Sequence, residues 1–413
     1  MFLLVPRTVK PASKTILPQD RQLALRLACM DDGPLREQLQ CLRDLPAHGN
    51  RKLQYHHLFL GLLLAFFDPL ARSLRLIEDQ GDFGGKLDLP RLARSTTADA
   101  LRVMDSAHLQ PLINELRQRV PDLQCRDQDL GGIVRRIIAA DGTYLTTLAD
   151  VAWALHHTTP SGRKQGQVRL NVQMDVDNWC PQVLSVSGDD GSEPAAFMKD
   201  LLSSVLYVID RNFLDFGFLG TLLEKDNDFV LRVRSNAPST QVSQTLPLGA
   251  ADLEAGVVSD QIVWLTGKAA PQGLFRLVTI HSIDRRGKPE TILLLTNLID
   301  TNIAAHVIGS VYRLRWQIEL FFKWLKTWAR LDHLLSTSRN GITFQFYVAV
   351  IGVLMMYLQS GKRISVYALA ALGRLARGQC TLDQAMEIIA RRDREAQMNR
   401  ARQQRRRARK KLA

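Results

Sequence analysis

The segment VRRIIAADGTY, residues 134–144, marks the point at which the character of the chain changes. Its four apolar residues, 137–140, end at Asp141-Gly142, which is typical of a short buried strand followed by a turn signal. Before this segment apolar residues recur at helical spacing, whereas residues 168–176 after it alternate with a period of two. A sheet is therefore predicted to begin here.

The elements expected after this point alternate between strands and helices. Helices are predicted at 194–204 and between the last two core strands, and strands at 137–140, 168–176, 183–186, 205–209 and 229–233. Residues 236–295 are rich in strand signals, and 304–328 form a long predicted helix. The order β-β-β-α-β-α-β, an insertion and a final helix predicts an α/β fold, with an RNase H-like mixed sheet core interrupted by a β-rich insertion.

The same patterns divide the chain into regions. Residues 1–130 read as a helical region, in which Ser95-Thr96-Thr97 would join two helices of a helix-turn-helix or of an ordinary helical hairpin. Residues 131–235 and 296–360 form the split RNase H-like core around the β-rich insertion, 236–295. Residues 361–413 are predicted to be helical and to end in a basic tail, with Ser365 and Thr381 as helix N-caps.

Basic residues exceed acidic ones, mostly at the carboxyl end. The 413-residue chain has 54 Lys and Arg against 41 Asp and Glu, a formal net charge of +13. Residues 391–413 contain eleven Lys or Arg against Asp393 and Glu395, so this tail holds +9 of the excess. The balance favours a polyanionic partner, most simply nucleic acid, whose phosphates the tail would contact without reading bases. A solvated helix end that aids solubility is the alternative.

Other patterns exclude several classes of protein. The apolar runs 58–67 and 347–358 are shorter than the roughly 20 residues that cross a bilayer. The five cysteines form no Cys-x-x-Cys pair, so neither a zinc ribbon nor a disulfide framework is indicated. Pro6, Arg7 and Lys10 interrupt the apolar start before a secretory signal develops. We therefore expect a cytoplasmic protein with no membrane partner.

Three acidic residues occupy positions from which their side chains could converge. Asp141 closes the first core strand, Asp210 closes the fourth, and Glu319 lies in the long helix. If the two strands are neighbours, the aspartates emerge together at one sheet edge. A helix that crosses this edge could bring Glu319 next to them. Converging carboxylates require a compensating cation, and their hard oxygens suit Mg²⁺, with Mn²⁺ as a substitute.

The helix around Glu319 reads YRLRWQIELFFKWLK over residues 312–326. At about 100° per residue, five polar residues fall within an arc of roughly 80°, opposite an apolar face: Tyr312, Arg315, Glu319, Lys323 and Lys326. On a generic helix this would be a solvated face with an ion pair between Arg315 and Glu319. Beside a metal-binding carboxylate, the cations would instead hold phosphates.

The spacing Tyr312-x2-Arg315-x3-Glu319-x6-Lys326 resembles the Y-R-E-K signature of bacterial insertion-sequence DDE transposases of the insertion-sequence-four type. Asp141-Gly142-Thr143 is similar to the first-aspartate motif of that family. Asp210-Arg211-Asn212-Phe213 is similar to the second, with Asn212 in place of the usual glycine. Thr296-Asn297 and the β-rich insertion also match in order, and the resemblance spans residues 55–358.

The resemblance implies a DNA transposase that cleaves the inverted-repeat ends of an insertion sequence, forms and reopens a terminal hairpin, and transfers the 3′-hydroxyls to target DNA. It implies that Asp141, Asp210 and Glu319 are catalytic and bind metal, and that the DNA-binding residues are Tyr312, Arg315, Lys323 and Lys326. The implied partners are double-stranded DNA and a second copy of the chain, as a homodimer on DNA in the bacterial, nucleoid-associated cytoplasm. The helical residues 1–130 would then serve DNA binding and association. Hairpin formation would suit a stacking residue, Trp264 or Trp316, although packing roles are the alternative for both. The rival functions are a catalytically silent DNA-binding derivative and a stand-alone metal-dependent nuclease.

Overall fold

The chain divides into two compact units in the computed structural model, one formed by residues 122–323 and the other by 1–121 with 324–413. The residues that the structure describes are 33–46, 53–67, 73–79, 90–120, 130, 132–147, 151–159, 161–162, 164–189, 191–234, 238–283, 287–327, 331, 333–360, 371, 374 and 379–411.

A mixed sheet of ten strands, as far as the described residues show it, forms the first unit. The strands are β1 (Ile137–Thr147), β2 (Leu155–Thr158), β3 (Lys164–Asp175), β4 (Cys180–Ser187), β5 (Leu206–Ile209), β6 (Asp228–Val233), β7 (Thr240–Thr245), β8 (Val257–Leu265), β9 (Leu274–Ile283) and β10 (Pro289–Thr296). β1 pairs antiparallel with β3 and parallel with β5, and β5 pairs parallel with β6. This mixed arrangement confirms the predicted RNase H-like sheet.

The strands of the β-rich segment continue the same sheet. β10 pairs antiparallel with β6, and the order then runs β10-β9-β8-β7. A fully buried ion pair joins β9 to β8, in which Arg276 Nη2 lies 2.6 Å from Asp260 Oδ2. Arg276 Nη1 also donates to the carbonyl of Ile303 at 2.7 Å. The strand-rich segment therefore fixes the residues that lead into the next helix, α11 (Ala305–Arg313).

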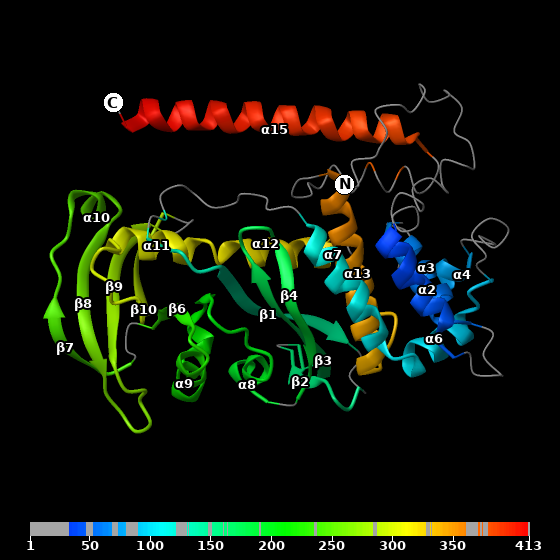
Figure 1. The fold of residues 1–413 in the computed structure, drawn as a ribbon, viewed down its shortest axis with the longest axis horizontal. Coiled ribbons are helices and arrows are strands. Elements are labelled where there is room, and N and C mark those ends of the chain that lie inside the picture. The colour runs from blue at the N-terminus through cyan, green and yellow to red at the C-terminus, as the bar shows by residue number, and fades with distance from the viewer. Residues whose placement is uncertain are drawn as a thin grey trace. The chain divides into compact units, whose positions relative to one another are not determined.

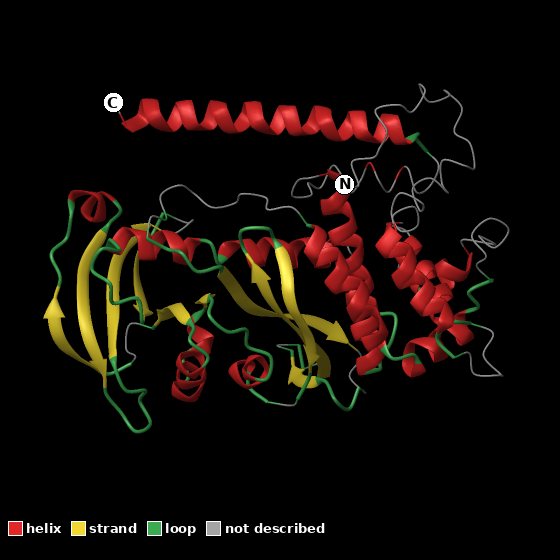
Figure 2. Ribbon diagram, in the orientation of Figure 1, coloured by secondary structure: helices red, strands yellow, loops and turns green. Residues whose placement is uncertain are grey.

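Helices cover both faces of this sheet (Figures 1 and 2). On one face lie α8 (Glu193–Met198), the 3-10 turn η2 (Arg211–Phe213) and α9 (Phe216–Glu224). Their apolar side chains form one core with the strands, including Phe197, Phe213, Phe218, Ile138, Tyr207 and Ile209. α11 contacts β5, β6, β8 and β9, burying residues such as Ile308 and Val311. The short helix α10 (Ala250–Glu254) precedes β8, and α12 (Trp316–Thr327) follows α11.

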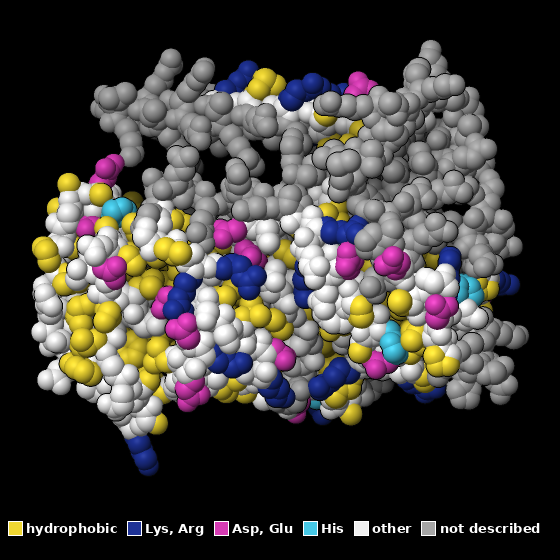
Figure 3. All heavy atoms as spheres, viewed as in Figure 1, with side chains coloured by type: hydrophobic (Ala, Val, Ile, Leu, Met, Phe, Trp, Pro, Cys, Tyr) yellow, Lys and Arg dark blue, Asp and Glu magenta, His cyan; other side chains and the backbone are white. Residues whose placement is uncertain are grey.

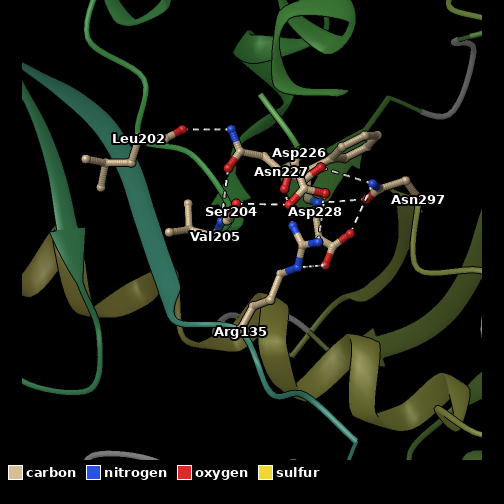
Figure 4. Close-up of polar contacts among 9 residues, drawn as sticks. Arg135, Leu202, Ser204, Val205, Asp226, Asn227, Asp228 and Asn297 are labelled. Atoms are coloured by element: carbon tan, nitrogen blue, oxygen red, sulfur yellow. Dashed lines mark hydrogen bonds and ion pairs between the residues drawn. The ribbon is translucent and has the colours of Figure 1, made fainter. Parts of the chain in front are cut away.

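A polar network holds together the starts of the parallel strands (Figure 4). Asn297, which follows β10, accepts a hydrogen bond from the backbone N–H of Phe229 at 2.9 Å and donates to Asp228 at 3.2 Å. Arg135 Nε lies 3.1 Å from the Asp228 carboxylate. Asn227 accepts from the backbone N–H of Val205 at 3.0 Å. Asn297 therefore joins the end of β10 to the start of β6, at the end of β5 and β6 that is opposite to Asp210.

The second unit is helical among its described residues. Its elements are α2 (Gly33–Asp44), α3 (Tyr55–Phe67), α4 (Leu74–Asp79), α6 (Arg94–Val103), η1 (Ser106–Leu109), α7 (Gln110–Arg119), α13 (Arg339–Ser360) and α15 (Leu382–Lys411). α13 packs against α3, α6 and α7. Thr381 caps α15 as predicted, because its Oγ1 accepts from Gln384 N–H while Gln384 Oε1 accepts from Thr381 N–H. Within the described part of the chain, no helix is both long and apolar enough to cross a membrane.

Several predicted boundaries are wrong. Ser95-Thr96-Thr97 lie inside the continuous helix α6, so they do not join two helices. β1 runs on past Asp141, because β3 pairs with it as far as Thr147. The helix predicted at 194–204 ends at Met198. The helix predicted at 304–328 is broken at Leu314 and Arg315, which close i→i+3 hydrogen bonds of 3.0 and 3.1 Å instead of continuing α11. The predicted cap at Ser365 lies outside the described residues.

Candidate active site

Asp141 and Asp210 lie side by side at one edge of the central sheet. Ala139 of β1 is the register partner of Val208 of β5 in a parallel pairing. Asp141 and Asp210 each follow two residues later, so both project from the face opposite the α8–α9 core. Their backbones hold both carboxylates, because Asp141 Oδ1 accepts from Gly142 N–H at 2.8 Å and Asp210 Oδ1 from Arg211 N–H at 2.7 Å.

Arg315 links the first of these carboxylates to Glu319. It occupies the break between α11 and α12, and its side chain is 13% exposed. Its Nη1 lies 3.2 Å from Asp141 Oδ2, while its Nη2 donates to Glu319 Oε1. The (i, i+4) ion pair expected of a generic helix face is therefore present, but this part of the face is not solvated, and the same guanidinium also reaches a residue 174 positions earlier in the sequence. The structure thus brings Asp141, Asp210, Arg315 and Glu319 to one place.

The electrostatic environment of Asp141 is far from that of an exposed carboxylate. Burial raises the pKa of Asp141 to about 7, although the positive charge of Arg315 opposes the rise and the negative charges of Glu193 and Asp210 add to it. A carboxylate in this environment is stabilised in its charged form by added positive charge. The site therefore favours binding of a further cation.

Tyr312 and Arg232 complete the polar surroundings. The guanidinium carbon of Arg315 lies 5.9 Å from the centre of the Tyr312 ring. Burial raises the pKa of Tyr312, and its hydroxyl is close enough to Arg315, Asp210 and Arg232 for their charges to act on it. Arg232 extends from β6, one residue beyond the register partner of Ile209. Arg232 was not predicted from the sequence, because a single arginine in a short strand carries no recognisable pattern.

The remaining predicted DNA-binding residues belong to α12. Lys323 is exposed on this helix. Lys326 belongs to the helical unit, where partial burial lowers its pKa. The break before α12 means that the five polar residues do not form the continuous helical stripe that was predicted. Trp316 and Trp264 have side chains that are 40% and 43% exposed, in α12 and β8 respectively.

Divalent metal ions fit the chemistry of this donor set, because carboxylate oxygens are the ligands that Mg²⁺ and Mn²⁺ prefer. Within the described residues, no three acidic, histidine or cysteine side chains are arranged to hold a metal ion. Arg315 instead neutralises Asp141 and Glu319. A cation held by these carboxylates would take over a role that the guanidinium fills in the structure.

Glu193 is a fourth acidic residue at this edge, which sequence reasoning missed. It is the first residue of α8, and its charge acts on both Asp141 and Asp210. Burial raises the pKa of Glu193, while Arg169 and the N–H of Gly142 lower it. In the sequence it appears only as an ordinary acidic residue in the first turn of a helix, after the N-cap Ser192.

Comparison with known proteins places this arrangement in a family. Residues 132–356 match the family model described as the transposase DDE domain. A protein of Sinorhizobium fredii named as transposase y4zB is 29% identical over 201 residues, covering 48% of this chain and 54% of that protein. One of Geobacillus stearothermophilus, named as the transposase of insertion sequence element IS5377, is 25% identical, covering 56% and 59% of the two chains.

A third relative, of Synechocystis, is named as the transposase of insertion sequence element IS4SA and is 27% identical over 37% of this chain and 40% of its own length. The chain thus spans about half the length of these relatives. The matched model covers the sheet, both aspartates, Arg315 and Glu319, and this agrees with the resemblance seen in the motifs. The chain belongs to the transposase DDE domain family.

Proposed function

We propose that the protein is a DNA transposase that cleaves the inverted-repeat ends of an insertion sequence and transfers the resulting 3′-hydroxyls to target DNA. The observation that carries this proposal is the position of Arg315, between Asp141 and Glu319 and beside Asp210. Three carboxylates from separate parts of the chain share one buried cation here, and such clusters are typical of functional sites.

Asp141, Asp210 and Glu319 would hold the metal ions, with Mg²⁺ as the natural ion and Mn²⁺ as a substitute. When bound, two such ions would activate a water or 3′-hydroxyl and stabilise the leaving oxygen of a phosphodiester. Arg315 would then be released from the carboxylates and would bind a DNA phosphate, which offers the same paired oxygens to its planar donors. Tyr312 of α11 would orient Arg315, and Arg232 of β6 would add positive charge near the neighbouring phosphate.

DNA beyond the cleavage site would be bound mainly by Lys and Arg side chains outside the carboxylate cluster. Lys323 and Lys326 extend along α12, and α15 ends in the basic tail. On the face of the described residues in Figure 3, Lys and Arg side chains are interspersed with Asp and Glu, so a strongly basic segment such as α15 would add most to non-specific affinity. Trp264 and Trp316 are exposed enough to stack on a displaced base.

Paired cleavage of two ends requires two active sites, so we propose a homodimer on DNA, in the bacterial cytoplasm at the nucleoid. Light scattering on DNA that carries two repeat ends should show two chains per complex. A complex with one chain would contradict this part of the proposal.

A joining assay separates transposition from its rivals. The full chain would be incubated with Mg²⁺, a target plasmid and linear DNA that carries the repeats flanking its own coding region. Joined products identify a transposase, whereas cleavage without joining identifies a metal-dependent nuclease. Specific binding without cleavage identifies a silent DNA-binding derivative and would refute the proposed function.

A further inference from the structure

Glu193 approaches Asp141 through a space that only a glycine leaves open. The residue after Asp141 is Gly142, and a Cβ at this position would overlap Oε1 of Glu193 and lie 3.0 Å from Cδ of Arg169. Glu193 comes from α8, which packs on the face of the sheet opposite to Asp141. Because position 142 has no side chain, the carboxylate can reach the backbone of β1 at the edge where the aspartates lie.

The buried side chain of Arg169 fixes the position of Glu193. Arg169 of β3 is 3% exposed, and its Nη2 donates to the carbonyls of Ser192 at 3.3 Å and Gly191 at 3.5 Å. Its Nε donates to Asn171 Oδ1 at 3.0 Å. The guanidinium therefore holds the two residues that precede Glu193, and its positive charge acts on the Glu193 carboxylate. The start of α8 is thereby fixed relative to β3, the strand paired with β1.

Glu193 and Asp141 share one hydrogen-bond donor. The backbone N–H of Gly142 donates to Asp141 Oδ1 at 2.8 Å and also interacts with Glu193. If both Asp141 oxygens turn toward a metal ion, this N–H loses the carboxylate acceptor that lies 2.8 Å away. A backbone N–H that loses its acceptor away from water destabilises the structure. Glu193 is placed to accept that hydrogen bond and to remove this destabilisation.

We propose that Glu193 is a positioning residue of the active site, which accepts the Gly142 N–H when Asp141 binds a metal ion and so leaves the Asp141 carboxylate free to coordinate. This inference rests on the metal-dependent function proposed above. Glu193 would act through the backbone of Gly142, and its loss would weaken metal binding more than it slows the chemical step.

Direct binding of Mn²⁺ to the full chain, followed by electron paramagnetic resonance of the free ion, tests the role without relying on activity. Glu193→Ala should raise the Mn²⁺ concentration for half-saturation by about 10-fold or more, as loss of a group behind a metal ligand typically does. Cleavage at saturating Mn²⁺ should stay within about threefold of wild type. Glu193→Gln keeps an acceptor for the N–H and should recover most of the affinity. Equal losses in the Gln and Ala variants would overturn the proposal.

The matched control is Glu224→Ala, which removes an exposed carboxylate from the end of α9 and should leave Mn²⁺ binding unchanged. Gly142→Ala should reproduce the loss, because its methyl group displaces Glu193. When Glu193 is already Ala, Gly142→Ala should reduce the Mn²⁺ affinity much less, as expected for coupled positions. Wild-type Mn²⁺ affinity in Glu193→Ala would overturn the inference. Wild-type affinity and cleavage in Glu319→Ala would instead refute the metal-dependent function.

Discussion

Replacing Asp141 with Asn should change how the stability of the metal-free protein depends on pH. Burial raises the pKa of Asp141 from 3.8 to about 7; Arg315 opposes the rise, and Glu193 and Asp210 add to it. Between these pH values the folded protein holds a proton that the unfolded chain has lost. The free energy of unfolding therefore falls as the pH rises through this window, and stays low above pH 7.

The size of the effect follows from the two pKa values. Proton linkage gives a cost to the folded wild type of roughly 1.7 kcal/mol at pH 5 and roughly 4 kcal/mol at pH 8. Asn cannot ionise, so the variant escapes this cost. The weaker contact of Asn with Arg315 lowers the free energy of unfolding of the variant by the same amount at every pH. This loss therefore cancels when two pH values are compared. Relative to wild type, the unfolding free energy of Asp141→Asn should thus increase by about 2–3 kcal/mol from pH 5 to pH 8.

Urea titrations of the full chain in EDTA, followed by tryptophan fluorescence, measure both unfolding free energies. Asp189→Asn removes an exposed carboxylate of the same unit and should give a profile parallel to wild type. Added Mg²⁺ at pH 8 should stabilise wild type and narrow its difference from Asp141→Asn. A difference that changes by less than about 0.5 kcal/mol between the two pH values would refute the account of Asp141.

Three further outcomes are expected. Arg276→Leu leaves the Asp260 carboxylate buried without its partner, so thermal or urea unfolding should show a loss of about 3–5 kcal/mol, and a loss below about 1 kcal/mol would contradict the buried ion pair. Deletion of residues 400–413 removes eight Lys or Arg and no acid. It should weaken binding to all DNA and flatten the dependence of log K on log salt, and an unchanged slope would contradict the proposed contact of the tail with DNA phosphates. Lys326→Ala should weaken both cleavage and binding to repeat ends, as measured by nicking and gel-shift assays. Arg313 is exposed, and Arg313→Ala should affect neither, so similar losses in both variants would contradict a specific role for Lys326.

The central strands and the two aspartates could be predicted from the sequence because their signals are local. Residues 206–209 are all buried, and three of the four are aliphatic, as expected of a short central strand with parallel neighbours. Asp210 follows directly, and the parallel pairing of β1 with β5 places Asp141 next to it. The ion pair of Arg315 with Glu319 also depends only on helical spacing. The strand signals and the helical spacing are local, whereas the adjacency of the two aspartates required the assumption that β1 and β5 are neighbours.

The rest depends on contacts between distant residues, which periodicity does not encode. The break at Arg315 leaves the apolar period nearly intact, so the sequence reads as one helix although the guanidinium turns to Asp141. The side chain of Gln317 accepts a hydrogen bond from Nε1 of Trp179, a distant contact that the sequence does not show. Gln317 is therefore unsuitable as a control variant, whereas Arg313 is exposed and suitable. Glu193 reaches the site because of the space at Gly142, which becomes evident when the strands and α8 are assembled.

The central claim is that the carboxylates beside Arg315 perform metal-dependent DNA cleavage. Its most direct test is the rate of nicking of repeat-end DNA by Glu319→Ala in Mg²⁺, with binding to the same DNA measured in parallel. We predict that nicking is abolished and that binding is retained, because affinity for phosphates comes from the cations. Nicking at the wild-type rate would contradict the account, and the chain would then be a DNA-binding protein whose carboxylates perform no chemistry.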